Sequence, residues 1–80
     1  MAVISDVLSL RRKELHITQK ELSDKTKISI VSLAKYEKGE RLPSYENLAR
    51  IADALALDYD EVSNILENEK RNRKERVYGN

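Results

Sequence analysis

The stretch that decides the fold is residues 18–39, TQKELSDKTKISIVSLAKYEKG. Thr18, followed three residues later by Glu21, has the pattern of a capping box, in which side chains and backbone at a helix start bond each other reciprocally. Ser29 is a second capping residue, and Gly39 is a residue type at which helices commonly end. The stretch therefore predicts two short helices joined by a tight turn.

The same signals continue on both sides of this stretch. Apolar residues recur at helical spacing before and after it, and Asp58 with Glu61 repeats the capping-box pattern. We expect five helices, over about residues 4–15, 19–25, 29–38, 44–55 and 58–66. Because the links between them are short, the sequence predicts a compact all-α domain over residues 1–66. Residues 67–80 are mostly charged or polar, and a charged helical extension or tail is expected there.

The composition excludes several classes of protein. Two glycines, one proline and four aromatic residues argue against an all-β fold. The chain has no apolar run of transmembrane length and no signal-peptide pattern, and it lacks cysteine, so a cytoplasmic protein is expected. With one histidine, no glycine-rich phosphate loop and no nucleophile–base set, we expect no metal, no cofactor and no enzymatic activity.

Charge is distributed unevenly along a chain whose net charge is only +1. Residues 1–41 carry nine Lys/Arg and six Asp/Glu, residues 42–69 carry one and seven, and residues 70–80 carry five and one. The chain therefore has a basic front, an acidic middle and a basic end. Such a polarised molecule is suited to turn one face toward an anionic partner.

Two charged residues fall on faces that the periodicity predicts to be buried. Arg12 lies on the apolar stripe of the first helix, and Glu37 lies beside Leu33 on the inward side of the third. An unpaired charge in a protein interior is strongly unfavourable, so two opposite charges on inward faces are expected to pair. We predict an Arg12–Glu37 ion pair; the alternative is that both side chains reach solvent separately.

The outward side of the third helix lacks acidic residues. Its candidate base-facing residues are Ile30, Val31, Ser32 and Lys35. An aliphatic side chain suits a thymine methyl, a hydroxyl donates or accepts, and a lysine suits guanine O6 and N7. This face is therefore predicted to read base edges in DNA. Two alternatives stay open: Ile30 and Val31 form the edge of the core, or Lys35 is an ordinary solvated lysine.

The residues quoted so far resemble the phage-repressor helix-turn-helix family, also called the XRE or Cro-like family. The resemblance covers about residues 4–66, and its anchors are Leu8 and Arg12, T-Q-x-E-L at 18–22, S-x-x-x-L-x-x-Y-E-x-G-x-x-x-P at 29–43 and L-x-x-I-A-x-A-L at 48–55. It implies a five-helix, lambda-repressor-like domain that binds double-stranded DNA. It also implies a homodimer on a pseudo-palindromic operator, with the third helix in the major groove.

Functional residues carry over from the family by position. The resemblance implies base contacts for the four outward residues of the third helix. It implies phosphate contacts for Gln19, Ser29, Lys38, Gly39 and Arg41. It also implies a buried ion pair at Arg12 and Glu37, which the charge placement predicts independently.

Three positions depart from the family pattern. Lys27 stands where the turn most often has glycine, Ala56 stands where glycine often ends the fourth helix, and Ser23 replaces an alanine at the contact between the second and third helices. A non-glycine residue in a left-handed turn costs about 1 kcal/mol, which is tolerable. The apolar pair Ile30 and Val31 departs too, and it predicts thymine-rich half-sites.

The expected function is a sequence-specific transcriptional regulator, most simply a repressor that occupies an operator and blocks polymerase. The alternative is an antitoxin or adaptor module whose main partner is another protein, on which the tail, residues 67–80, folds. The basic run 70–74 within it contacts phosphates or an acidic protein, or is simply solvated. An anti-repressor or a toxin is the corresponding candidate partner. The dimer interface is expected along the last helix, at exposed parts of Leu57, Tyr59, Val62 and Leu66.

Overall fold

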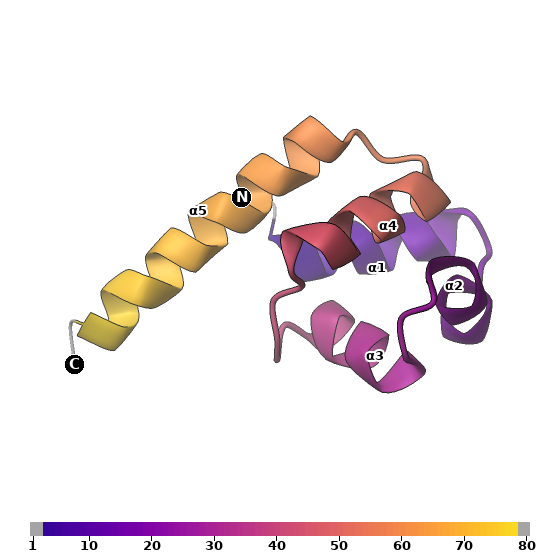
Figure 1. Cartoon of the computed structure of the whole chain (residues 1–80), viewed down its shortest axis with the longest axis horizontal. Helices are drawn as coiled ribbons and strands as arrows, with labels where there is room; N and C mark the ends of the chain where they lie inside the picture. Colours follow the sequence, from indigo (N-terminus) through magenta and orange to yellow (C-terminus); the bar gives the residue numbers. More distant parts are fainter. Residues whose placement is uncertain (1–2, 79–80) are drawn as a thin grey trace.

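The structure is a computed structural model that describes the backbone of residues 3–78 and the side chains of residues 3–72. Over these residues it contains helices and no strand (Figure 1). The helices are α1 (Ile4–Glu14), α2 (Gln19–Thr26), α3 (Ile30–Lys38), α4 (Tyr45–Leu55) and α5 (Tyr59–Tyr78). The predicted all-α, five-helix fold is therefore confirmed.

α2 and α3 start at the predicted capping residues Thr18 and Ser29, and at the start of α5 the Asp58 carboxylate accepts from the N–H groups of Asp60 and Glu61 at 2.9 and 3.4 Å. Thr18 Oγ1 accepts from the Glu21 N–H at 3.0 Å, and the Glu21 carboxylate accepts from the Thr18 N–H at 3.0 Å, which completes the capping box. These hydrogen bonds lower the pKa of Glu21, the one from the Thr18 backbone most. The stabilisation is therefore present above the usual carboxyl pKa and is lost as pH falls through the lowered value. Ser29 and Ser44 accept in the same way from the third residue of α3 and of α4, each at 3.1 Å.

Three helices end at a residue in the left-handed conformation. These are Lys27 after α2 with φ of 62°, Gly39 after α3 with φ of 77° and Ala56 after α4 with φ of 55°. Lys27 and Ala56 thus keep a backbone conformation that favours glycine, although both carry a Cβ. The three turns let the chain reverse direction within a few residues.

All five helices contribute side chains to the core. α1 packs against α3, α4 and α5, α2 packs against α3 and α4, and α4 packs against α5. Tyr36 is buried at 3% exposure, and its hydroxyl accepts a hydrogen bond from the Asn47 amide at 3.0 Å. The largest fully buried side chains are those of Ile4, Leu8, Leu22, Leu33, Pro43, Leu48, Ile51, Leu55 and Leu66.

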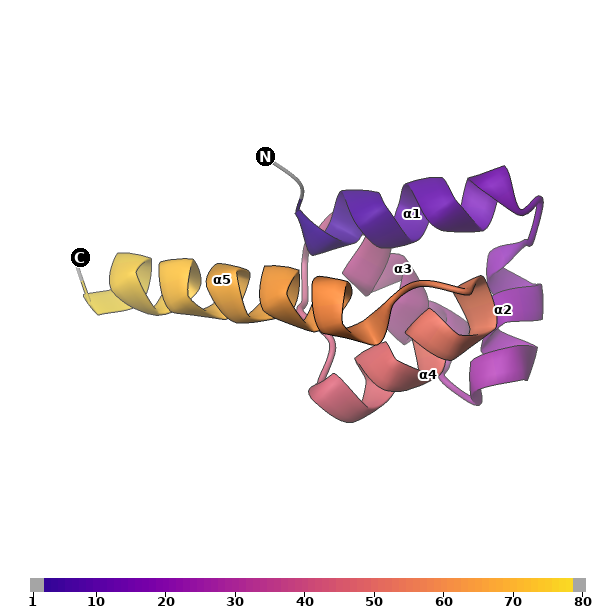
Figure 2. The same ribbon diagram turned by 90° about the horizontal axis from the view of Figure 1, so that it is seen from above.

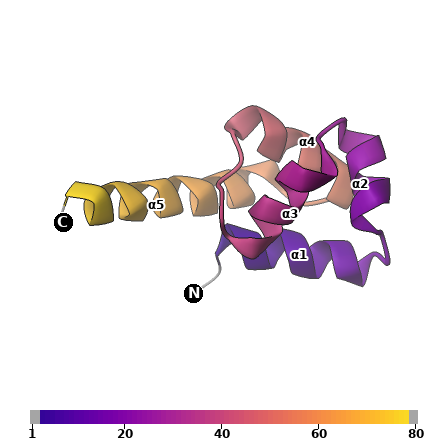
Figure 3. The same cartoon turned by 90° about the horizontal axis from the view of Figure 1, so that it is seen from below.

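The helices are arranged so that α3 lies on one side of the molecule and α4 and the start of α5 lie on the other (Figure 1). The view turned by 90° in Figure 2 shows α1 and α4 on either side of the first half of α5. Seen from below in Figure 3, α3 lies in front of the other helices. Within residues 3–78, no helix combines the length and apolar composition that crossing a membrane needs.

α5 continues far beyond the core. Among the side chains described on α5, Leu66 is the last that is fully buried, whereas the helix runs to Tyr78 and projects from the body of the domain (Figures 1 and 2). The predicted extension, residues 67–80, is thus helical as far as residue 78, and its last two residues lie outside the described part. Acidic residues in the first turn and an Arg71–Glu67 ion pair at 3.2 Å favour this helix.

Replacing Ala56 with glycine is expected to stabilise the fold by roughly 0.5–1 kcal/mol, because glycine adopts the left-handed conformation without a Cβ clash. The matched control is Ala49→Gly on the exposed face of α4, which should destabilise by about 1 kcal/mol because it lies inside a helix. Urea unfolding measures both changes. An Ala56→Gly variant no more stable than the unmodified protein contradicts the strain assigned to this turn.

Candidate nucleic-acid interface

Local hydrogen bonds fix the turn between α2 and α3. The Ser23 hydroxyl donates to the carbonyl of Ile28 at 2.6 Å, so α2 is tied to the residue before the α3 cap. The Thr26 hydroxyl donates to the Leu22 carbonyl at 2.8 Å and accepts from the Ile28 N–H at 3.3 Å. Ser23, which departs from the family pattern, therefore adds a bond that an alanine lacks. The angle between α2 and α3 is held by this turn and by their shared core.

The predicted ion pair joins the first helix to the third. Arg12 Nε lies 2.7 Å from Glu37 Oε2, and Arg12 Nη2 lies 3.0 Å from Glu37 Oε1, so the guanidinium binds the carboxylate through two parallel bonds. The two side chains are 13% and 7% exposed. Hydrogen bonding to Glu37 raises the pKa of Arg12 against the opposing effect of burial. A third bond, from Arg12 Nη1 to the Ile17 carbonyl at 2.7 Å, fixes the turn before α2.

Gln19 extends this network to the start of α2. Its amide nitrogen donates to Glu37 Oε1 at 3.2 Å, so one carboxylate contacts side chains from α1 and α2 while it sits on α3. An amide group has two N–H donors, so the hydrogen bond to Glu37 leaves one for a ligand. Gln19 is half-buried. The network therefore orients the residue for which the family resemblance implies a phosphate contact.

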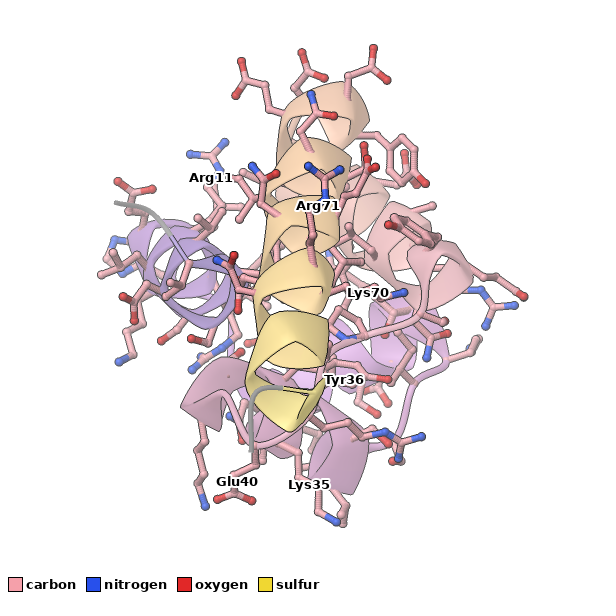
Figure 4. The ribbon with its side chains drawn as sticks, turned by 90° about the vertical axis from the view of Figure 1, so that its left-hand side faces the viewer. Arg11, Lys35, Tyr36, Glu40, Lys70 and Arg71 are labelled. Atoms are coloured by element: carbon pink, nitrogen blue, oxygen red, sulfur yellow. The ribbon has the colours of Figure 1, made fainter. Side chains whose placement is uncertain are left out.

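The outward face of α3 carries the predicted base-facing residues. Val31 is 65% exposed and Ile30 is 43% exposed, so neither is part of the closed core. Ser32 is half-buried, and its hydroxyl accepts a hydrogen bond from the Ser29 hydroxyl at 3.0 Å. Lys35 is exposed and points away from the body at the lower edge of Figure 4. A mixed apolar and cationic surface thus faces outward along one helix.

The loop after α3 presents cations but few free amides. Lys38 and Arg41 are exposed on either side of Gly39, which is half-buried. The N–H groups of Gly39 and Glu40 donate to carbonyls of α3 at 3.3 and 3.0 Å and so close the end of that helix. Gly39 therefore shapes the turn through its φ of 77°, and the long side chains beside it are the groups that reach outward.

Two of the four predicted dimer contacts are wrong for this fold. Val62 is 2% exposed and Leu66 is 0% exposed, because both point into the core against the other helices. Helical periodicity places them on one face of α5 but does not tell which neighbour covers that face. Leu57 is half-buried and Tyr59 is 40% exposed, so these two keep accessible surface.

Two contacts made by α5 beyond Leu66 were not predicted. The Ile4 N–H at the start of α1 donates to the Glu69 carboxylate, and Lys70 Nζ lies 4.1 Å from the centre of the Tyr45 ring. Neither pair has a local sequence signal, because the partners are far apart in the chain. Among the described residues, no cluster of three or more His, Cys, Asp or Glu side chains is arranged to hold a metal ion.

The chain matches a known family of DNA-binding folds rather than only the general architecture of a helical bundle. A helix-turn-helix family model matches residues 8–62. The chain belongs to the helix-turn-helix family. This match covers the ion pair, α2, α3 and the loop that follows, so the resemblance inferred from the sequence motifs is confirmed.

The chain is similar to two phage repressors, one by sequence and one by structure. The chain is 46% identical over 59 residues to the cryptic phage CTXphi transcriptional repressor RstR of Vibrio cholerae, a match that covers 74% of this chain and 53% of the relative. The chain thus spans about half the length of this curated relative. It is also similar to the P22 c2 repressor protein, crystallised with the synthetic operator 9T, with a TM-score of 0.72 and 29% identity over 78% of this chain and 94% of that one.

Replacing Glu37 with glutamine is expected to destabilise the protein by roughly 2–4 kcal/mol, because it leaves the buried Arg12 guanidinium without its charge partner. The double replacement Arg12→Met with Glu37→Met removes both charges and should recover most of the stability. Thermal and urea unfolding of the three proteins measure these effects. A Glu37→Gln variant with the stability of the unmodified protein would show that the pair contributes nothing to the fold.

Proposed function

We propose that this protein is a sequence-specific DNA-binding repressor that places α3 in the major groove of its operator. The observation that carries the proposal is the outward face of α3, where the exposed side chains of Ile30, Val31 and Lys35 lie beside the half-buried Ser32 hydroxyl. The repressor named among its relatives and the likeness to a repressor crystallised with operator DNA support it. Binding over a promoter blocks polymerase sterically, so the protein itself needs no catalytic chemistry.

Base recognition in this proposal comes from two kinds of contact. Ile30 and Val31 pack against thymine methyl groups, which favours thymine-rich half-sites. Lys35 donates to guanine O6 and N7, and Ser32 donates to a base acceptor while its oxygen accepts from Ser29. These contacts supply specificity because each depends on which base edge is present in the groove.

Phosphate contacts in this proposal come from residues around α3. Gln19 binds a phosphate with the N–H group that it does not donate to Glu37, and Ser29 binds one with its backbone N–H at the start of α3. Lys38 and Arg41 bind phosphates through their exposed side chains, with Gly39 setting the turn that presents them. These contacts position α3 in the groove and add affinity that is independent of sequence.

The proposal includes a homodimer. A single α3 reads only a few base pairs, so two copies related by a two-fold axis are needed to specify an operator. Leu57 and Tyr59 are the accessible apolar residues of the expected interface. Their position at the start of α5 leaves α3 of each copy free to enter DNA.

In vitro selection of duplexes from a random pool, at fixed near-physiological salt, tests the proposal. We expect a pseudo-palindrome with half-sites about one helical turn apart. Recovery of salt-sensitive binding without sequence preference would contradict the proposal and favour the adaptor function, in which the main partner is a protein.

Replacing Lys35 with alanine should weaken operator binding by about 1–3 kcal/mol and relax the preference at the base that it contacts. Arg50→Ala, which removes a cation from the exposed side of α4, is the matched control and should leave the affinity near that of the unmodified protein. Binding isotherms on the selected operator and on single-base variants measure both effects. Unchanged affinity and preference in Lys35→Ala contradict the assignment of α3 as the recognition helix.

A further inference from the structure

The first turn of α3 contains two serines that hydrogen-bond each other twice. Ser29 Oγ accepts from the Ser32 N–H at 3.1 Å, and the Ser29 hydroxyl donates to Ser32 Oγ at 3.0 Å. The first bond is the helix cap, which satisfies a backbone N–H at the start of α3. The second bond joins two side chains and satisfies no backbone group, so capping does not explain it.

The start of α2 shows how such a position is ordinarily used. There the third helical residue, Glu21, accepts from the Thr18 N–H and completes a capping box. The third residue of α3 is Ser32, and its short side chain accepts from the Ser29 hydroxyl instead. The Ser29 N–H is therefore left for the proposed phosphate contact, while the two side chains bond each other.

The bond between the two hydroxyls determines what each can still offer to a ligand. A serine hydroxyl has one hydrogen and two acceptor lone pairs. Ser29 commits its hydrogen to Ser32, so its hydroxyl has no donor left for a phosphate. Within residues 3–72, the Ser32 hydroxyl donates to no other group. Because its oxygen already accepts one bond, its O–H is a stronger donor and its remaining capacity to accept is smaller.

The Ser32 hydroxyl lies beside the residues proposed to face bases. Three residues turn an α-helix by about 300°, so Ser32 and Lys35 lie one turn apart on the same side of α3. Lys35 is exposed and points away from the body in Figure 4. Ser32 is half-buried, so its hydroxyl keeps some accessible surface while Ser29 holds it in place. The free donor is therefore on the side of α3 that also carries the exposed cation.

We propose that Ser29 is a positioning residue for base recognition, because its hydroxyl presents Ser32 to the DNA as a hydrogen-bond donor. The inference rests on the proposed function, since it takes α3 to lie in the major groove. The partner is an acceptor on a base edge, such as guanine O6 or N7 or thymine O4. The amino group of cytosine is a donor and is disfavoured at this position. Ser29 thus affects specificity without contacting a base.

A double-mutant cycle with Ser29→Gly, Ser32→Ala and both changes together tests this coupling. Base preference is measured as the ratio of affinities for the selected operator and its single-base variants. We expect Ser32→Ala to reduce the preference at one base pair roughly fivefold, which is the loss of one hydrogen bond. Ser29→Gly should reduce it at the same base pair by about threefold. The double variant should match Ser32→Ala, because Ser29 then has no hydroxyl to position.

Two further variants separate this role from capping. Ser44→Gly makes the same change at the cap of α4, and it should lower stability as Ser29→Gly does while leaving base preference unchanged. Ser29→Thr retains both the cap and the donor hydroxyl, so it should retain the preference. Circular dichroism of all variants checks that helix content is kept, as expected because glycine is tolerated at a helix cap.

Three results would overturn the proposal. A uniform loss of affinity in Ser29→Gly, with every base preference kept, would limit Ser29 to the cap and the phosphate contact. Additive losses of preference in the double variant would show that the two serines act independently. Unchanged preference in Ser32→Ala would show that this hydroxyl does not contact a base. Failure of the proposed function is distinguishable, because the unmodified protein would then show no base preference at any position.

Discussion

The buried pair between Arg12 and Glu37 is the interaction on which the placement of the recognition unit depends. Three bonds from the guanidinium hold the Glu37 carboxylate on α3 and the carbonyl of Ile17 in the turn before α2. The same carboxylate accepts from Gln19 at the start of α2. α1, α2 and α3 therefore meet at one polar point. Since a buried charge without its partner is strongly unfavourable, this point tolerates little displacement of any of the three helices.

Short helices need such fixed points because they have little stability of their own. α2 has eight residues and α3 has nine, and isolated helices of this length are marginal in water. Capping by Thr18 and Ser29 satisfies N–H groups at their starts, and the left-handed residues Lys27 and Gly39 end them abruptly. The result is a pair of helices whose relative angle is set by local hydrogen bonds and by the core rather than by helix propensity. The proposed recognition role of α3 needs this rigidity, since base contacts depend on the depth of a helix in the groove.

Local chemistry can be predicted from this sequence, whereas packing between distant elements cannot. The cap at Thr18 is identifiable because a cap involves only neighbouring residues. The Arg12–Glu37 pair is identifiable because two opposite charges on inward faces have few alternatives. The complete burial of Val62 and Leu66 cannot be predicted in this way. Periodicity shows that they share one face of α5, but it does not show which helices pack against that face. The hydrogen bond between the Ile4 N–H and the Glu69 carboxylate joins residues 65 positions apart in the chain, and the sequence around neither residue predicts it. The outward positions of α3, which are proposed to face bases, can be predicted because they lie opposite the core residues of that helix.

The charges of this protein are distributed unevenly between its two sides, although its net charge is only +1. The acidic residues of segment 42–69 belong to α4, to the loop before α5 and to the first part of α5, whereas Lys35, Lys38 and Arg41 belong to α3 and the loop after it. In Figure 1, α3 lies on one side of the molecule and α4 and the start of α5 lie on the other. A polyanion is repelled by the first group and attracted by the second, so the encounter favours the face proposed to read bases. Repulsion between DNA and the acidic side also disfavours the opposite orientation, in which the protein would bind DNA without reading its sequence. A domain with a net charge near zero can thus approach DNA in one orientation, because the direction of its dipole, rather than its total charge, selects the contacting face.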